Sequence, residues 1–186
     1  MKNAAIVFFL LLGPVGFSSF KNLTYAQPKC VESAIKWLSW ENALEKCKVQ
    51  KRKLLVDVYT DWCGWCKRMD GTTFENTQIA NYVNAHFYAI KFNAESKADI
   101  EFKGKTYKFV KNGMRGYHEL AAEITRGRLS YPTIVFLDEN LQVIQPIPGF
   151  KNDFEFEQII TYFGRNEHKK TPWELYQQNY KPMKGK

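Results

Sequence analysis

The sequence has few of the residues that hold metals and none of the common nucleotide-binding motifs. Its 186 residues include only 4 cysteines and 3 histidines. A structural zinc site needs about four ligands, usually from two closely spaced cysteine pairs, whereas His86, His118 and His168 each stand alone in the sequence. No GxGxxG or P-loop pattern is present. These shortages predict a protein without a metal, nucleotide or flavin, and we expect no cofactor.

Negative charge is also scarce. The chain has 27 Lys and Arg against 19 Asp and Glu, which gives a formal net charge of +8. The basic residues are scattered in short clusters such as "KVQKRK", without a long basic block or a nucleic-acid motif. This pattern is typical of a soluble protein with some attraction to acidic surfaces, so we expect no nucleic-acid partner.

The N-terminal residues differ in character from the rest of the chain. The apolar run from Asn3 to Phe17 is uncharged, and glycine and proline interrupt its end. A membrane-spanning helix needs about 20 apolar residues, which this run does not reach. We interpret residues 1–26 as a secretory signal peptide that ends in "TYA", with an uncleaved anchor as the alternative. We therefore expect an exported, periplasmic protein, a compartment in which disulfides form and persist.

Strand and helix patterns alternate along the remaining chain, which predicts an α/β fold with a mixed sheet. We expect strands in 34–40, 53–60, 87–94 and 131–149, a hairpin at 99–111, and helices in 40–50, 67–87 with a break at Gly71, 116–127, 153–163 and 171–180. The hairpin is interpreted as a decoration of the sheet edge, with a substrate-facing flap as the alternative. About 150 residues is typical of one domain, so the chain is expected to form a single one.

The stretch "TDWCGWCKRM" places Cys63 and Cys66 three positions apart after a buried strand. The pair could be a redox couple, a metal clip or a structural disulfide, and its position favours the first. A cysteine at the start of a helix gains free N–H groups and the positive end of the helix dipole, which lower its pKa. We therefore expect Cys63 to be the exposed nucleophile, and Cys66, one helical turn further and more inward, to resolve the mixed disulfide.

Two charged residues interrupt apolar strands. Asp57 lies within "LLVDVY" and Lys91 within "YAIKFN". A buried charge is costly unless it is paired or neutralised. We predict that the two side chains lie close together on adjacent strands; the alternative is that both point to solvent at strand edges.

The segment "LLVDVYTDWCGWCK" resembles the active-site segment of thioredoxin-like proteins, and "YPT" at 131–133 resembles their cis-proline signature. The resemblance covers about residues 35–163. Over this range the chain is similar to secreted bacterial thioredoxin-related proteins and to the terminal domain of transmembrane thiol–disulfide interchange proteins. It implies a thioredoxin fold, with a mixed central sheet flanked by helices and a small β-hairpin insertion. The domain would span residues 27–165, followed by a basic tail, 166–186, with a short helix.

The resemblance also implies roles for individual residues. Asp57 matches the buried acid that accepts the proton of the resolving cysteine, and Lys91 matches its lysine neighbour. Burial is expected to raise the pKa of such an acid toward neutrality. The substrate-binding surface is expected to include Trp62, Trp65, Tyr131 and Pro132.

Three features depart from thioredoxin itself, and one is the segment from Asn93 to Gly116, which is longer than thioredoxin's connection and contains the hairpin. Trp65 replaces the proline between the cysteines, so the redox potential of the family cannot be transferred. Cys30 and Cys47 form either a second, structural disulfide or a loop thiol and a helix-packing thiol.

The predicted function is an exported thiol–disulfide oxidoreductase, a reductase rather than an oxidase. We expect a monomer whose partners are disulfide-containing proteins and an upstream dithiol electron donor, such as a membrane thiol transporter. The alternative function is a non-catalytic thioredoxin-fold module that binds a partner protein or a metal.

Overall fold

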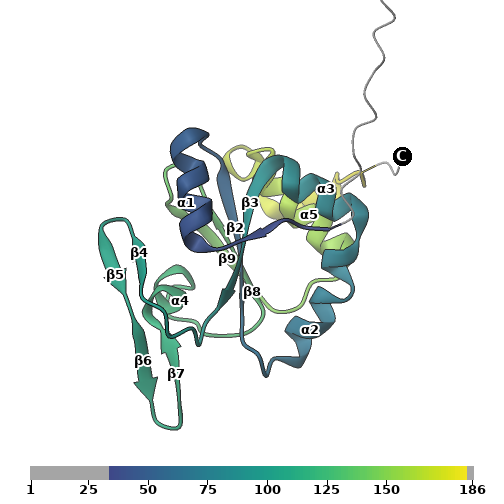
Figure 1. The fold of residues 1–186 in the computed structure, drawn as a ribbon. Helices are drawn as coiled ribbons and strands as arrows, with labels where there is room; N and C mark the ends of the chain where they lie inside the picture. The colour runs from purple at the N-terminus through teal and green to yellow at the C-terminus, as the bar shows by residue number, and fades with distance from the viewer. Residues whose placement is uncertain (1–33, 184–186) are drawn as a thin grey trace, which may run out of the picture. The chain divides into compact units, whose positions relative to one another are not determined.

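The structure is a computed structural model that describes residues 34–183 (Figure 1). The predicted signal peptide, 1–26, and Cys30 lie outside the described residues. In chain order the elements are β1 (Trp37–Leu38), α1 (Trp40–Val49), β2 (Lys53–Tyr59), α2 (Gly64–Asp70), the 3₁₀ turn η1 (Thr73–Glu75), α3 (Thr77–His86), β3 (Phe87–Asn93), β4 (Ile100–Phe102), β5 (Lys105–Tyr107), β6 (Phe109–Asn112), β7 (Arg115–His118), α4 (Glu119–Ile124), β8 (Thr133–Leu137), β9 (Val143–Pro148), α5 (Asp153–Gly164), η2 (Glu167–Lys169) and α6 (Trp173–Gln178).

A five-stranded sheet of order β1-β3-β2-β8-β9 forms the centre of the fold. The central strand β2 pairs in parallel with β3 and antiparallel with β8, which makes the sheet mixed, as the sequence predicts. Six of the seven residues of β2 are buried. A near-continuous apolar run is typical of a strand that is covered on both faces.

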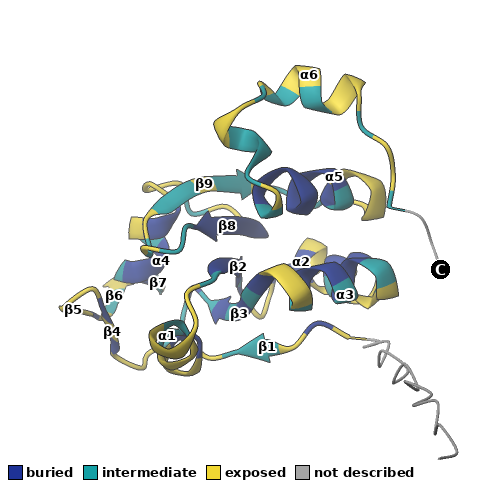
Figure 2. Cartoon of the chain, turned by 90° about the horizontal axis from the view of Figure 1, so that it is seen from above, coloured by how far each residue is buried: buried dark blue, intermediate teal, exposed yellow. Residues whose placement is uncertain are grey.

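Helices cover both faces of the sheet (Figure 2). Because successive side chains of a strand point to opposite faces, Leu55 packs in a cluster with residues of α2, α3 and α5. Leu54 and Val56 pack on the other side with residues of α1 and α4. Asp57 is two residues after Leu55, so its side chain points to the same face of the sheet. This is the face covered by α2, the helix that begins at the cysteine pair.

The helix boundaries follow from local capping. The side chain of Asn76 accepts hydrogen bonds from the backbone N–H groups of Gln78 and Ile79, so α3 restarts there after the break at Gly71. Asn152 and Glu155 form a capping box at the start of α5. Such caps satisfy N–H groups that the first turn leaves unpaired. Among residues 34–183, no helix combines the length and apolar character needed to cross a bilayer.

The segment between β3 and α4 differs from the prediction, because it forms two hairpins rather than one. β4 pairs with β5 as expected, but Phe109 starts a new strand, and β6 pairs with β7. The helix predicted from Gly116 therefore begins only at Glu119. The turn of the second hairpin has Gly113 at φ 60°, a conformation that glycine adopts easily. Asn112 pairs with Arg115, so the loop consists of Gly113 and Met114. Glycine at the first position of a two-residue loop is a hairpin signal in the sequence.

Candidate active site

The cysteine pair lies at the junction between β2 and α2. Cys63 is the N-cap residue of α2, and its Sγ accepts a hydrogen bond from the backbone N–H of Cys66 at 3.0 Å. The two cysteines form a disulfide with their Cα atoms 5.3 Å apart. Cys63 therefore lies just after the carboxyl end of β2, at the edge of the sheet. The first turn of α2 places Cys66 next to it, within bonding distance.

The environment of the disulfide is more closed than the sequence predicts. Cys63 is 5% exposed and Cys66 2% exposed, so the expected exposure of Cys63 is wrong for the oxidised state. The neighbouring Trp62 and Trp65 are 52% and 56% exposed. Large aromatic side chains therefore flank the disulfide on the surface.

Asp57 and Lys91 lie where the sequence predicts, opposite each other on adjacent strands. Asp57 is 1% exposed, and its Oδ2 accepts a hydrogen bond from Lys91 Nζ at 2.6 Å. The other carboxylate oxygen, Oδ1, is buried and has no hydrogen-bond partner among the residues that the structure describes. A buried hydrogen-bond acceptor without a partner costs free energy. Because no described group donates a hydrogen bond to Oδ1, this oxygen is available to accept a proton.

The electrostatics of the pair suit a proton acceptor. Burial raises the pKa of Asp57 to about 6, although the ammonium group of Lys91 acts in the opposite direction. Burial alone would lower the pKa of Lys91, but the carboxylates of Asp57 and Asp70 outweigh it and the pKa is raised. At neutral pH, Lys91 is therefore protonated and Asp57 is mostly ionised but close to its titration range.

Asp70 completes this network and was not recognised from the sequence. It forms a short ion pair with Lys91 Nζ, the same atom that binds Asp57. Asp70 is the last residue of α2 and lies one turn after Cys66, on the same face of the helix. The network therefore connects the buried carboxylate of β2 to the helix face that holds Cys66. The four-residue spacing between Cys66 and Asp70 indicates a shared helix face, but it does not indicate the contact with Lys91.

The second predicted signature lies at the same edge of the sheet. The Tyr131–Pro132 peptide bond is cis, and β8 starts directly after it. Because β8 runs antiparallel to β2, its first residue, Thr133, pairs with Val58 near the carboxyl end of β2. The rings of Tyr131 and Trp62 contact each other, with centroids 5.8 Å apart. The cis-proline segment thus lies beside the cysteine loop.

Two arginines, neither of them predicted as a site residue, stack on the exposed tryptophans. Arg115 of β7 places its Cζ 4.4 Å from the ring centroid of Trp62. Arg68 places its Cζ 5.3 Å from the ring of Trp65 and 5.6 Å from that of Phe150. Trp65 and Arg68 are three residues apart on α2, a spacing that places two side chains on the same helix face. Arg115 is distant from Trp62 in the chain, so residue spacing gives no signal for that contact.

The family comparison agrees with this geometry. Residues 22–150 match the family Thioredox_DsbH, described as "Protein of unknown function, DUF255". The chain belongs to this family. It is 26% identical over 118 residues to the uncharacterized protein B0495.5 of Caenorhabditis elegans, covering 54% of this chain and 16% of that protein. It is 25% identical over 68 residues to spermatogenesis-associated protein 20 of Rattus norvegicus, covering 36% of this chain and 9% of that protein. The chain thus spans a small part of the length of these relatives.

Solved structures share the fold of this Thioredox_DsbH protein. A structure titled "DsbH Oxidoreductase" superposes with a TM-score of 0.51 at 18% identity, over 77% of this chain and 93% of that one. A thioredoxin-fold protein from Helicobacter pylori gives a TM-score of 0.54 at 21% identity, over 83% and 89% of the two chains. The chain is therefore a thioredoxin-fold protein of the thioredoxin-like superfamily with a CxxC disulfide.

The third described cysteine lies away from this site. Cys47 is a free thiol on α1, which covers the opposite face of the sheet from α2. Its Sγ lies 3.8 Å from the backbone oxygen of Arg52, and burial raises the pKa of the thiol. Cys30 lies outside the described residues, so its pairing with Cys47 stays a prediction.

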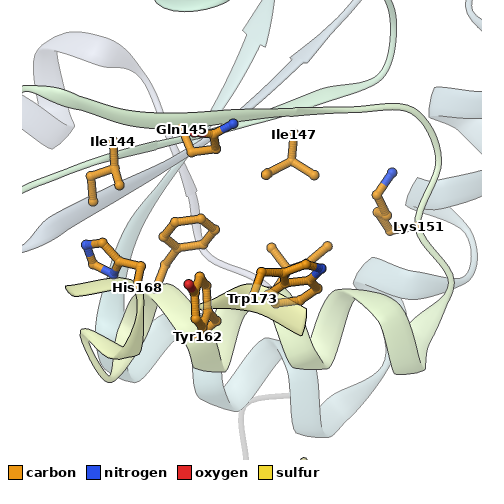
Figure 3. Close-up of a pocket in the computed structure, with 9 residues that line it drawn as sticks. Ile144, Gln145, Ile147, Lys151, Tyr162, His168 and Trp173 are labelled. Carbon is orange, nitrogen blue, oxygen red and sulfur yellow. The ribbon is translucent and has the colours of Figure 1, made fainter. Parts of the chain in front are cut away.

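A separate cavity of about 570 Å³ lies between β9 and α5 and is bordered by the C-terminal segment (Figure 3). Ile144, Ile147 and Trp173 supply much of its apolar wall, and His168 and Lys151 lie toward opposite ends. Lys151 Nζ donates to the backbone oxygens of residues 148–150. The described residues that line the cavity include no cysteine and no carboxylate, so the cavity is separate from the cysteine site.

Proposed function

We propose that this protein is a thiol–disulfide oxidoreductase that exchanges electrons with protein disulfides through Cys63 and Cys66. The observation that carries the proposal is the disulfide at the first turn of α2, where the N–H of Cys66 points at Cys63 Sγ. This donor would stabilise the Cys63 thiolate after reduction, since hydrogen bonds to the charged form lower a pKa.

The reaction consists of two exchanges. In the reduced protein, the Cys63 thiolate attacks a substrate disulfide, forms a mixed disulfide and releases one substrate thiolate. Cys66 then loses its proton and attacks Cys63 Sγ. This step forms the Cys63–Cys66 disulfide and releases the second substrate thiolate. The substrate gains two electrons, and a dithiol donor protein returns two electrons to the pair.

Asp57 is the proposed acceptor of the Cys66 proton. Its Oδ1 is buried and has no hydrogen-bond partner among residues 34–183, and its pKa of about 6 allows it to take and return a proton near neutrality. The Lys91 ammonium would hold Asp57 ionised until Cys66 transfers its proton, and Asp70 would keep Lys91 in place from α2. Asp70 is therefore proposed as a positioning residue.

We propose reduction as the physiological direction. A buried base that activates Cys66 speeds release of the reduced substrate, and no histidine lies between the cysteines to favour the opposite direction. The expected export of the chain would supply oxidised substrates. It would also require a donor, such as a membrane protein that carries electrons from cytoplasmic thiols.

A turnover assay tests the proposal. In excess dithiothreitol, the protein should accelerate insulin reduction severalfold or more, because Cys63 provides a stabilised thiolate at neutral pH. The rate is followed by precipitation of the free insulin chains. Cys47→Ser is the matched control and should retain the acceleration, since Cys47 lies on the other face of the sheet. If the folded wild type does not exceed dithiothreitol alone, the binding-module alternative is favoured.

A further inference from the structure

The surface around the disulfide contains positive charge that the fold itself does not neutralise. Arg68 and Arg115 stack on Trp65 and Trp62, and both arginine residues are exposed. Neither side chain forms a hydrogen bond or an ion pair with any residue between 34 and 183. Lys67, which follows Cys66, and Lys111, which belongs to β6, are also exposed. Their side chains likewise form no hydrogen bond or ion pair with the described residues.

The acidic groups of this surface already have partners. Glu95 accepts a hydrogen bond from Trp62 Nε1 at 3.1 Å, and Asp61 accepts one from Asn93 Nδ2 at 3.1 Å. Neither carboxylate forms an ion pair with a described cation. The rim of the disulfide therefore presents unpaired cations beside acids that are held in hydrogen bonds.

The hairpin β6–β7 is placed to contact a substrate. A shallow hollow of about 480 Å³ separates it from the active-site loop, with Asp61 and Glu95 on one side and Met114 and Arg115 on the other. The turn of β6–β7 and the β2–α2 loop lie at the same end of the fold, whereas the turn of β4–β5 points to the other end (Figure 1). Gly116 fits closely within the hairpin, because a Cβ there would lie 2.2 Å from the ring of Phe109.

We propose that this hairpin and Arg68 form a docking surface for acidic substrate segments. The preferred partner would be a protein whose reactive disulfide is flanked by Asp or Glu. Guanidinium groups match carboxylates in a bidentate geometry. Stacking on Trp62 and Trp65 orients them in advance, which reduces the entropy lost on binding. The inference rests on the proposed function and adds a substrate class to it.

Peptide substrates test the inference. Three synthetic peptides would each contain one disulfide loop, flanked by Glu, Gln or Lys, and their reduction by the pre-reduced protein would be measured. Each rate constant is divided by that for dithiothreitol, which corrects for the intrinsic reactivity of the disulfide. We expect the acidic peptide to react roughly tenfold faster than the basic one at low salt. The preference should shrink at high ionic strength, where exposed charges are screened.

Charge reversal identifies the residues responsible. Arg115→Glu and Arg68→Glu should each lower the preference for the acidic peptide by about two- to fivefold, the range typical of exposed ion pairs. Lys105→Glu, on the hairpin β4–β5, makes the same change in net charge and should leave the preference as it is. Equal corrected rates for the three wild-type reactions would overturn the inference and leave the oxidoreductase function standing. An equal loss in Lys105→Glu would also overturn it, since net charge would explain the preference. Reduction of none of the peptides would overturn the proposed function, and this inference with it.

Discussion

Replacement of Cys66 with serine should turn the protein into a trap for its substrates. Cys63 would still attack a substrate disulfide, but no second thiol would remain to release the mixed disulfide. Turnover should fall by at least about a thousandfold, and disulfide-linked complexes should accumulate. Non-reducing electrophoresis of extracts, followed by mass spectrometry, would detect them and identify the captured proteins.

The matched control is Cys63→Ser, which should abolish both turnover and trapping. The assignment rests on position, because Cys63 caps α2 beside the exposed Trp62, while Cys66 lies within the first turn. If Cys63→Ser traps partners and Cys66→Ser does not, the two roles are reversed. If both variants turn over as fast as the wild type, the disulfide is not the reactive group.

Replacement of Asp57 with asparagine should slow the resolving step by roughly 10²-fold and at most 10⁴-fold, the range that general base catalysis contributes. In the wild type, the pKa of about 6 predicts that the rate rises with pH through this value, because protonated Asp57 cannot accept the proton of Cys66. The Asp57→Asn variant should lack this rise. Stopped-flow measurement of mixed-disulfide decay between pH 5 and 8 would show both effects.

Variants of the two partners of Asp57 test whether this carboxylate is the source of the pH dependence. Lys91 lowers the pKa of Asp57, so Lys91→Gln should move the rise to higher pH. Asp70 acts in the opposite direction, so Asp70→Asn should move the rise to lower pH. A rise that stays at the same pH in both variants, or that persists in Asp57→Asn, would contradict the proposed role of Asp57.

Much of this site could be predicted from the sequence because its main elements are local. The run "KLLVDVY" predicts a buried strand, and its position before the cysteines places them at the carboxyl edge of the sheet. The proximity of Asp57 and Lys91 followed from a physical constraint, since an apolar strand tolerates a charge only when a partner is near. The register of β2 and β3 places the two residues opposite each other.

Other features depend on tertiary packing and could not be derived from residue spacing. Asp70 reaches the buried pair only because α2 folds back over β2 and β3. Arg115 reaches Trp62 because the segment after β5 forms a second hairpin, β6–β7, whose last residues, from Gly116 on, were predicted to begin a helix. Lys91 is distant in the chain from Asp70, and Trp62 from Arg115, so a local pattern contains no information about these contacts.

The reduction potential of the Cys63–Cys66 pair tests the central claim most directly. The protein would be equilibrated in dithiothreitol or glutathione buffers, and its free thiols would be alkylated and counted by mass spectrometry. A redox-active pair that serves as a reductase should titrate as one two-electron couple, with a midpoint above about −300 mV and well below the roughly −120 mV of strong oxidants. A pair that stays oxidised at potentials well below about −300 mV would behave as a structural disulfide and would contradict the proposed function.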